Sequence, residues 1–198
     1  MSVSIDDIKK LKELSGIGLT DAKAALVEAN GDFDKALEAL RKKGLTKAEK
    51  KGDREAREGV IDSYVHSGRI GVLVEVNCET DFVARLDGFK TFAHEIALQI
   101  AAMAPVYVSE ADIPAVELDR VRAEAKERVI AEGKPAELAD KIVDGQVKKH
   151  FEEKVLLTQT YIKNDKQTVN DFLKANVALL GENLVIRQFK RIELGVSE

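Results

Sequence analysis

The feature that most constrains this fold is a change of hydrophobic period within residues 70–103. From Ile70 to Val76 apolar residues occupy alternate positions, a spacing typical of a strand with one buried face. From Phe89 to Met103 they recur every three to four positions instead, which predicts an amphipathic helix. We therefore expect a core that contains both strands and helices, with a short loop joining these two segments.

The segment between the strand and the helix is a candidate binding site. It contains Thr80, Asp81, Phe82 and Val83, so that an acidic residue is followed by a large aromatic one. Loops held by rigid elements often carry binding groups, and an exposed aromatic there could insert into a partner. The alternative is that Asp81 caps the next helix and Phe82 packs into its own core, because buried aromatic residues outnumber exposed ones.

Composition indicates a soluble, folded protein without a general affinity for nucleic acid. The 198 residues are 44% hydrophobic and 33% charged, and the net charge of -4 provides no basic field for a polyanion. No apolar run reaches membrane-spanning length, and residues 1–7 lack the pattern of a signal peptide. The single cysteine, Cys78, ends an apolar strand and is expected to be buried. We expect a cytoplasmic protein without a membrane partner.

Residues 1–44 have the pattern of three short helices. The first carries an apolar face from Ile5 to Leu14, the second begins near Thr20, and the third begins at Asp32. Together they predict a compact bundle with a thin core. Residues 45–59 carry charges of both signs and no apolar stripe, which favours a solvated linker.

The glycines of the first interhelical turn offer an alternative function. Gly16-Ile17-Gly18 followed by a helix is similar to a helix-hairpin-helix element, in which free backbone N–H groups hold a phosphate. Asp21, however, places a negative charge where that phosphate would bind. Residues 1–58 carry 13 Lys and Arg against 12 Asp and Glu, too even a balance for strong non-specific attraction. A nucleic-acid-binding adaptor is therefore the disfavoured alternative.

Residues 60–198 predict a small, mainly antiparallel sheet with helices packed on it, and hence the α+β class. Strands are expected at residues 60–66 and 69–77, around the turn Ser67-Gly68, and at residues 184–194. Short extended stretches are expected at residues 106–108 and 156–162, and a helix from Thr168 to Gly181. Residues 114–153 read as two charged helices with a narrow apolar stripe, a pattern typical of a protruding, coiled-coil-like pair.

Catalytic and metal-binding patterns are not found in the sequence. His66, His94 and His150 are scattered, and Leu98 occupies the position that a second metal-binding histidine after His94-Glu95 would need. No phosphate-binding loop, dinucleotide fingerprint or nucleophile elbow is present. We expect a protein that acts by binding rather than an enzyme, with no cofactor and no metal.

Several segments taken in order resemble the bacterial elongation factor Ts family. They are Gly16–Leu26, Glu28–Asp32, Val74–Ala84, Gly181–Arg187 and Arg191–Gly195. The resemblance spans nearly the whole chain. It implies an N-terminal three-helix bundle like a ubiquitin-associated (UBA) domain, followed by a core domain with a helical excursion.

The resemblance also implies a partner and a mechanism. The partner is elongation factor Tu, in its GDP-bound and nucleotide-free states, from which the family promotes GDP release. Thr80, Asp81, Phe82 and Val83 match the stretch implicated in dislodging the partner's Mg²⁺. The N-terminal docking segment matches Ile17, Gly18, Leu19, Thr20, Asp21 and Ala22. The chain resembles the family's shorter form, for which we expect a homodimer paired through the core sheet or its edge.

Overall fold

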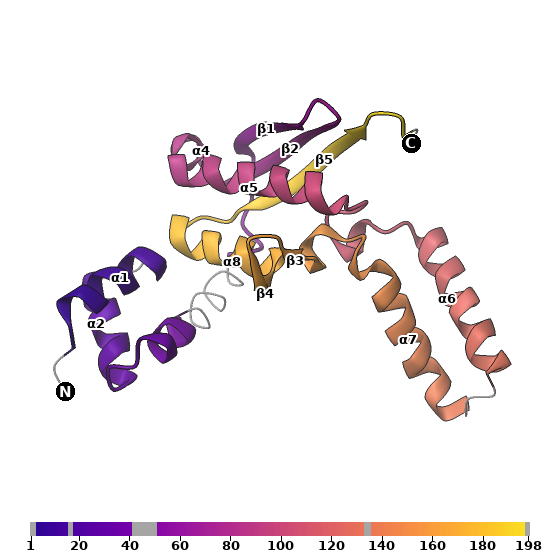
Figure 1. Cartoon of the computed structure of the whole chain (residues 1–198), viewed down its shortest axis with the longest axis horizontal. Coiled ribbons are helices and arrows are strands. Elements are labelled where there is room, and N and C mark those ends of the chain that lie inside the picture. Colours follow the sequence, from indigo (N-terminus) through magenta and orange to yellow (C-terminus); the bar gives the residue numbers. More distant parts are fainter. Residues whose placement is uncertain (1–2, 16–17, 41–50, 133–135, 197–198) are drawn as a thin grey trace. The chain divides into compact units, whose positions relative to one another are not determined.

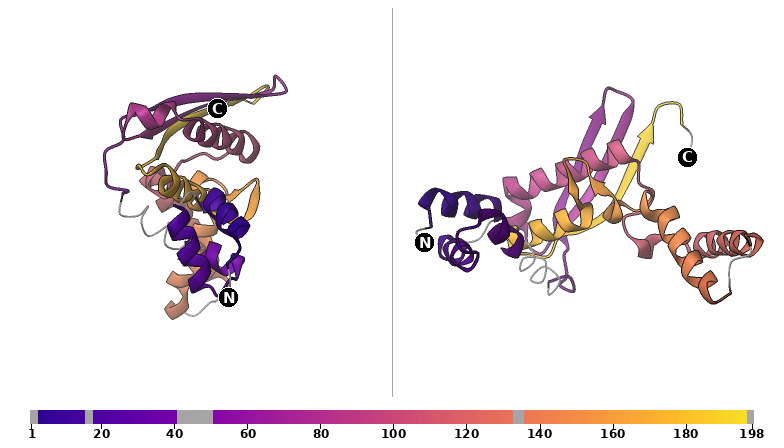
Figure 2. Two further views of the ribbon diagram at one scale, coloured as in Figure 1. Left: turned by 90° about the vertical axis from the view of Figure 1, so that its left-hand side faces the viewer. Right: turned by 60° about the horizontal axis from the view of Figure 1, so that its bottom comes forward.

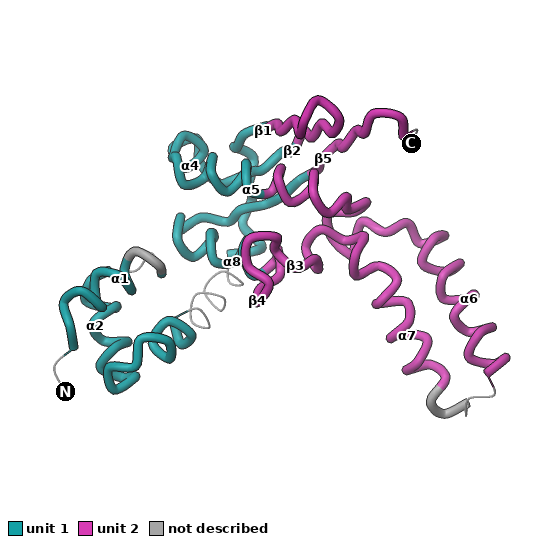
Figure 3. The backbone as a smooth tube through the Cα atoms, viewed as in Figure 1, with its two compact units in different colours: residues 1–62, 74–95, 171–187 teal, residues 63–73, 96–170, 188–198 magenta. Residues whose placement is uncertain are grey.

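The computed structural model describes residues 3–15, 18–40, 51–132 and 136–196 (Figure 1). By its internal contacts the chain divides into two compact units (Figure 3). Unit 1 comprises residues 1–62, 74–95 and 171–187, and unit 2 comprises residues 63–73, 96–170 and 188–198. The division cuts through β1, β2, β5, α5 and α8, so each unit contains part of the sheet and part of these two helices.

The N-terminal part of unit 1 consists of three helical segments. They are α1 (Ile5–Ser15), α2 (Leu19–Glu28) and the helical residues 33–40. Their shared core contains the buried residues Leu11, Ala22, Ala25, Leu26 and Ala36. Asn30 and Gly31 after α2 have positive φ angles of 55° and 84°, which agrees with the helix stop predicted there. These three helices were expected from periodicity, although the predicted end of the third at Gly44 lies outside the described residues.

The remaining chain contains a three-stranded sheet with the order β1-β2-β5, whose strands are seen side by side in Figure 2. Its strands are β1 (Glu58–His66), β2 (Ile70–Cys78) and β5 (Val185–Glu193). A tight turn joins β1 to β2, with Ser67 and Gly68 at positive φ, so these neighbours are antiparallel. β5 is also antiparallel to β2, because Gly71 lies opposite Ile192 at one end and the Arg187 side chain reaches Asn77 at the other. The predicted small antiparallel sheet and the α+β class are confirmed.

The inner face of the sheet carries the alternating valines of β2. Val72, Val74 and Val76 are almost completely buried, whereas Leu73 between them is exposed. Helix α5 (Asp87–Met103) contributes buried apolar residues at helical spacing, among them Phe89, Phe92, Ile96 and Ile100. In unit 1 the side chains of β1 and α5 meet where His94 Nδ1 lies 2.9 Å from Asp62 Oδ2. The change of period in the sequence therefore marks the change from strand to helix.

Helices α6 (Ala115–Ala131) and α7 (Ala136–Glu152) pack side by side in unit 2, as Figure 1 shows. Their interface is a narrow apolar stripe formed by Val121, Ala125, Val129, Val143, Val147 and Phe151. At the base of the pair the Tyr107 hydroxyl donates a hydrogen bond to Glu117, and this bond raises the pKa of Tyr107. Two helices broken near residues 133–135 were predicted, and the described residues contain both.

The predictions for the short extended stretches were only partly correct. Residues 106–108 form no strand, but Tyr107 makes an isolated parallel bridge to Val155. Residues 156–162 begin with a 3-10 turn (Leu156–Thr158) and only then enter β3 (Thr160–Tyr161). β3 pairs antiparallel with β4 (Asn164–Thr168), a strand that we did not predict because its residues are polar.

A buried amide joins α5 to this small hairpin. Gln99 is fully buried, and its Nε2 donates to Gln159 Oε1 and to Thr160 O, each at 3.1 Å. Its Oε1 accepts from the Ile162 N–H at 2.9 Å. The hairpin is thus fixed by hydrogen bonds rather than by apolar alternation.

Helix α8 (Val169–Leu180) follows the small hairpin and leads back to β5. In unit 1 its Phe172 ring packs on that of Phe92, with the ring centroids 5.4 Å apart. Gly181 ends α8 with a φ of 81°, as predicted. Among the described residues, none of these helices combines the length and the apolar character needed to cross a membrane.

Candidate functional site

The predicted binding segment is a short helix rather than a loop. Helix α4 comprises Asp81–Arg85, and Thr80 is its N-cap, whose hydroxyl accepts a hydrogen bond from the Val83 N–H. Thr80 therefore performs the capping role that the alternative interpretation gave to Asp81. The expected loop was wrong here because a single helical turn is too short to show a period in the sequence.

The two faces of α4 differ in character. Val83 and Ala84 are buried against the core, whereas the Phe82 side chain is 71% exposed. Packing of Phe82 into its own core, the alternative to a binding role, is therefore not what the structure contains. A phenyl ring held in water costs apolar hydration free energy that burial in a partner would recover.

The charges on α4 are also directed outward. Asp81 Oδ2 lies 2.6 Å from Arg85 Nη2, and both side chains are exposed. An exposed pair of this kind stabilises a helix by less than about 1 kcal/mol. Both side chains are therefore available to exchange this contact for one with a partner.

The segment before α4 is fixed by two carboxylates that lie far apart in the sequence. Glu182 Oε2 accepts hydrogen bonds from the Glu79 N–H at 3.1 Å and the Thr80 N–H at 3.0 Å. Its Oε1 accepts from the Thr80 hydroxyl at 2.6 Å. Glu79 Oε1 in turn accepts from the Asn183 N–H at 2.6 Å. In the sequence, residues 181–187 stand out only through the family resemblance, and no local pattern indicates this contact.

Below α4 lies the single cysteine. Cys78 is fully buried, as expected, and its Sγ lies 3.1 Å from Thr80 O. Burial and the nearby Glu182 carboxylate raise the pKa of the Cys78 thiol to about 11. The thiol is therefore a structural group and not a nucleophile.

Those of the predicted N-terminal docking residues that the structure describes lie at the start of α2. Gly18 is its extended N-cap, and Leu19, Thr20 and Asp21 follow with exposed side chains. Ala22 belongs to the buried core of the bundle and cannot contribute its side chain to a surface. Ile17 lies outside the described residues. The two groups of predicted residues thus belong to different elements, α2 and α4.

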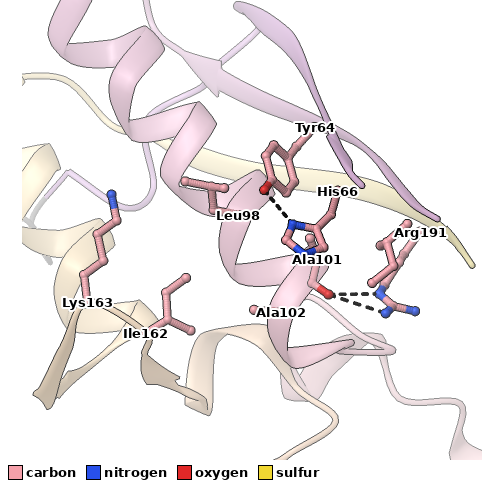
Figure 4. A pocket seen from close by; sticks show the side chains of 9 residues that line it. Tyr64, His66, Leu98, Ala101, Ala102, Ile162, Lys163 and Arg191 are labelled. Atoms are coloured by element: carbon pink, nitrogen blue, oxygen red, sulfur yellow. Dashed lines mark hydrogen bonds between the residues drawn. The ribbon is translucent and has the colours of Figure 1, made fainter. Parts of the chain in front are cut away.

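Unit 2 contains a pocket of about 390 Å³ below one end of β1 and β5 (Figure 4). Its floor is apolar and includes Leu98 and Ile162. The polar groups at its rim are engaged within the chain: Tyr64 Oη lies 2.9 Å from His66 Nδ1, and Arg191 donates to Ala101 O. No cluster of three metal-ligating side chains occurs in the described part of the chain.

Comparison with known proteins gives the context for this site. The family model described as Elongation factor TS matches residues 45–196. Elongation factor Ts of Thermoanaerobacter sp. (strain X514) is 51% identical over 194 residues, which cover 98% of this chain and 95% of that protein. Elongation factor Ts of Coprothermobacter proteolyticus is 48% identical over 196 residues, or 98% of this chain and 100% of that protein.

A third relative agrees with these two. Elongation factor Ts of Carboxydothermus hydrogenoformans is 51% identical over 189 residues, covering 95% of this chain and 87% of that protein. The matched regions include both α2 and α4, the elements that carry the predicted binding residues. The chain belongs to the elongation factor Ts family of translation elongation factors.

Proposed function

We propose that this protein binds elongation factor Tu in its GDP-bound state and promotes the release of GDP and its exchange for GTP. It acts by binding in the cytoplasm and catalyses no chemical reaction. The observation that carries the proposal is the 71% exposed Phe82 side chain on a helix whose opposite face is buried. Family membership supports the choice of partner.

In the proposed mechanism Phe82 inserts into the GTPase domain of the partner beside its nucleotide site. GDP and Mg²⁺ hold such a domain in one loop arrangement through phosphate and metal contacts. A protein that binds a different arrangement more tightly shifts the population toward it and so loosens Mg²⁺ and nucleotide. The coupling is reciprocal, because incoming GTP must weaken binding of the exchange factor by the same free energy.

The energy required exceeds what one aromatic residue supplies. A thousandfold faster release needs about 4 kcal/mol. Full burial of a phenylalanine side chain contributes about 1.5–3 kcal/mol. Thr80 and Asp81 of the same segment must therefore provide the remainder. Val83 is buried and contributes by holding α4 in place, and the N-terminal bundle contributes to docking.

The N-terminal helices provide the second contact in this proposal. The bundle is a UBA-like module that docks on the GTPase domain through Gly18, Leu19, Thr20 and Asp21 at the start of α2, with Ala22 shaping the surface from inside. Ile17, which lies outside the described residues, belongs to the same proposed docking segment. Leu19 supports this assignment, because its large apolar side chain is half exposed. Helices α6 and α7, with their narrow apolar interface, form a coiled-coil-like excursion from the core.

Release of a fluorescent GDP analogue from elongation factor Tu, followed by stopped flow, tests this function. The wild-type protein should accelerate release strongly, and Phe82→Ala should lower the maximal rate at least tenfold. The melting temperature should stay within a degree or two of wild type, because Phe82 is mostly exposed. Wild-type release rates in the Phe82→Ala variant would remove Phe82 from the mechanism.

The nucleic-acid-binding alternative is not favoured by these observations. Asp21 is exposed in the first turn of α2, where a bound phosphate would need a positive or neutral environment. Family membership also supports a translation factor rather than a helix-hairpin-helix adaptor. We therefore propose no direct nucleic-acid partner.

We further propose that the protein forms a homodimer through the outer face of its sheet. Four apolar side chains of unit 2, Val65, Leu73, Ile192 and Leu194, are more than half exposed on or beside the three strands. Leu73 alternates with the buried valines of β2, and Ile192 lies against Gly71 of that strand, so both belong to the outer face. A second copy placed symmetrically on this face would cover these four apolar side chains.

A further inference from the structure

We infer that the Glu182 carboxylate is a positioning group for exchange: it holds α4 in the orientation that presents Phe82. The inference rests on the proposed function for the role of Phe82, but the contact itself is independent of it. Glu182 would not touch the partner. It would act through the backbone of Glu79 and Thr80, the two residues that lead into α4.

Helix α4 needs such a support because it is very short. It contains five residues, fewer than two turns, and a segment of this length is not stable as a helix by itself. Its N-terminal N–H groups have no partners within the helix. The Thr80 hydroxyl satisfies one of them, that of Val83, over a long distance of 3.4 Å. The orientation of α4 therefore depends on what holds Thr80.

Glu182 holds Thr80 at two points. One carboxylate oxygen accepts from the Thr80 N–H at 3.0 Å, and the other accepts from the Thr80 hydroxyl at 2.6 Å. With its proton directed to Glu182, the hydroxyl oxygen keeps its lone pairs for the Val83 N–H. Glu182 thus fixes both the backbone and the capping rotamer of Thr80. Hydrogen bonds to an ionised acceptor are about twice as strong as neutral ones.

The carboxylate is itself held in place. Its neighbour Asn183 is buried and donates from its backbone N–H to Glu79 Oε1 at 2.6 Å. The Asn183 side chain donates to Gly52 O at 3.2 Å and to Arg54 O at 2.7 Å. Residues 79–80 and 182–183 therefore support one another reciprocally, and the segment cannot shift without breaking several bonds. This arrangement keeps an exposed aromatic residue in one place before any partner binds, which reduces the entropy cost of binding.

A general structural role for Glu182 makes a different prediction from a positioning role. If Glu182 only stabilised the fold, its removal would loosen the whole sheet and lower the melting temperature. If it positions α4, its removal reduces the fraction of bound complexes in which Phe82 is correctly placed. That fraction limits the maximal release rate, whereas the concentration that gives half-maximal effect also depends on the other contacts with the partner.

The test compares Glu182→Ala with Glu182→Gln and with the control Glu124→Ala. Glu124 is also ion-paired, to Arg120 at 2.7 Å, but it lies on the exposed surface of α6. We expect Glu182→Ala to lower the maximal GDP release rate about tenfold with a much smaller change in half-maximal concentration. Glutamine can still accept the two backbone N–H groups, so Glu182→Gln should retain most of the rate. Glu124→Ala should match wild type.

Two further measurements make the inference falsifiable. In the double variant Glu182→Ala/Phe82→Ala the rate should fall no lower than in Phe82→Ala alone, because Glu182 acts through Phe82. Amide hydrogen exchange at Glu79 and Thr80 should accelerate in Glu182→Ala, while exchange at Val74 and Val76 stays unchanged. Additive losses in the double variant, or unchanged exchange at Thr80, would overturn the positioning role. If the wild-type protein did not accelerate GDP release from elongation factor Tu, the proposed function would be overturned instead. Hydrogen exchange would still decide whether Glu182 fixes α4.

Discussion

Gly59 on β1 lies directly against the backbone of Val76 on β2. A Cβ atom on Gly59 would lie 2.1 Å from the carbonyl oxygen of Val76, and the φ angle of Gly59 is 152°, a value that side-chain-bearing residues rarely adopt. The obstructing atoms belong to backbone, so the neighbour cannot move aside without breaking the strand pairing. Glycine is therefore required here for the hairpin to form.

We predict that Gly59→Ala destabilises the protein by about 3 kcal/mol or more, because both the clash and the backbone conformation oppose it. Gly68 in the turn of the same hairpin is the matched control. It has a φ of 68° but no atom within 4 Å of its Cβ position. Gly68→Ala should therefore cost only about 1–2 kcal/mol. Urea unfolding measures the change in unfolding free energy of both variants. Equal destabilisation by the two substitutions would contradict the steric explanation.

The Cys78 thiol should be almost unreactive in the folded protein. Its side chain is fully buried and its pKa is raised to about 11, so at pH 8 only about one thiol in a thousand is ionised. A thiol reagent should label the native protein very slowly and the protein unfolded in guanidinium chloride within seconds to minutes. Rapid labelling under native conditions would show that the strand end opens readily.

The same raised pKa predicts the sign of a pH dependence. The folded pKa lies above the ordinary value of 9.0, so between about pH 9 and pH 11 the unfolded state has lost more protons than the folded state. The contribution of Cys78 to the free energy of unfolding is therefore fully present below about pH 9 and declines as the pH rises toward 11. The difference in unfolding free energy between wild type and Cys78→Ala should narrow over that range. A constant difference would contradict the burial of the thiol.

The sequence predicted those helices and strands in which apolar residues recur at a regular spacing over at least two helical turns or several strand positions. The hairpin, α5, α6, α7 and α8 all have such periods, and each is present with boundaries within a few residues. Helix α4 and strand β4 were not predicted, because one has too few residues for a period and the other is polar. Their stability comes from contacts with distant residues, which no local pattern records.

The candidate site was likewise only partly predictable from the sequence. Phe82 could be singled out from its place between a strand and a helix, but its exposure could not be deduced, since most such residues are buried. The contact between Glu182 and Thr80 joins residues 102 positions apart. A lone glutamate after a helix-ending glycine has many possible partners, and only the folded chain selects one of them.

The outer face of the sheet gives a prediction for the oligomeric state. Replacing Ile192, which is 68% exposed on the outer face of the sheet, by glutamate places a charge in the proposed dimer interface. We expect wild-type protein to have the mass of a dimer at micromolar concentration in light scattering, and Ile192→Glu to be a monomer.

The control for this prediction is Val116→Glu on α6. Val116 is 81% exposed but lies outside the sheet, so the variant should remain a dimer. Val116→Glu should keep the wild-type melting temperature, because the Val116 side chain already contacts water. Ile192→Glu should still fold but melt at a lower temperature, because it loses the stabilisation that dimer formation adds. A monomeric wild-type protein, or a dimer that survives Ile192→Glu, would reject pairing through this face.

The two proposed contacts with elongation factor Tu should affect different kinetic parameters. Leu19 at the start of α2 is 52% exposed and contributes to docking, so Leu19→Ser should raise the concentration for half-maximal GDP release by about tenfold. The maximal rate should change little, because the docked complex still places Phe82 in the partner. Val27 at the other end of α2 is 56% exposed, and Val27→Ser is the matched control with no expected effect. If Leu19→Ser instead lowered the maximal rate as Phe82→Ala does, the bundle would take part in dislodging the nucleotide, and separate docking and release contacts would no longer describe the protein.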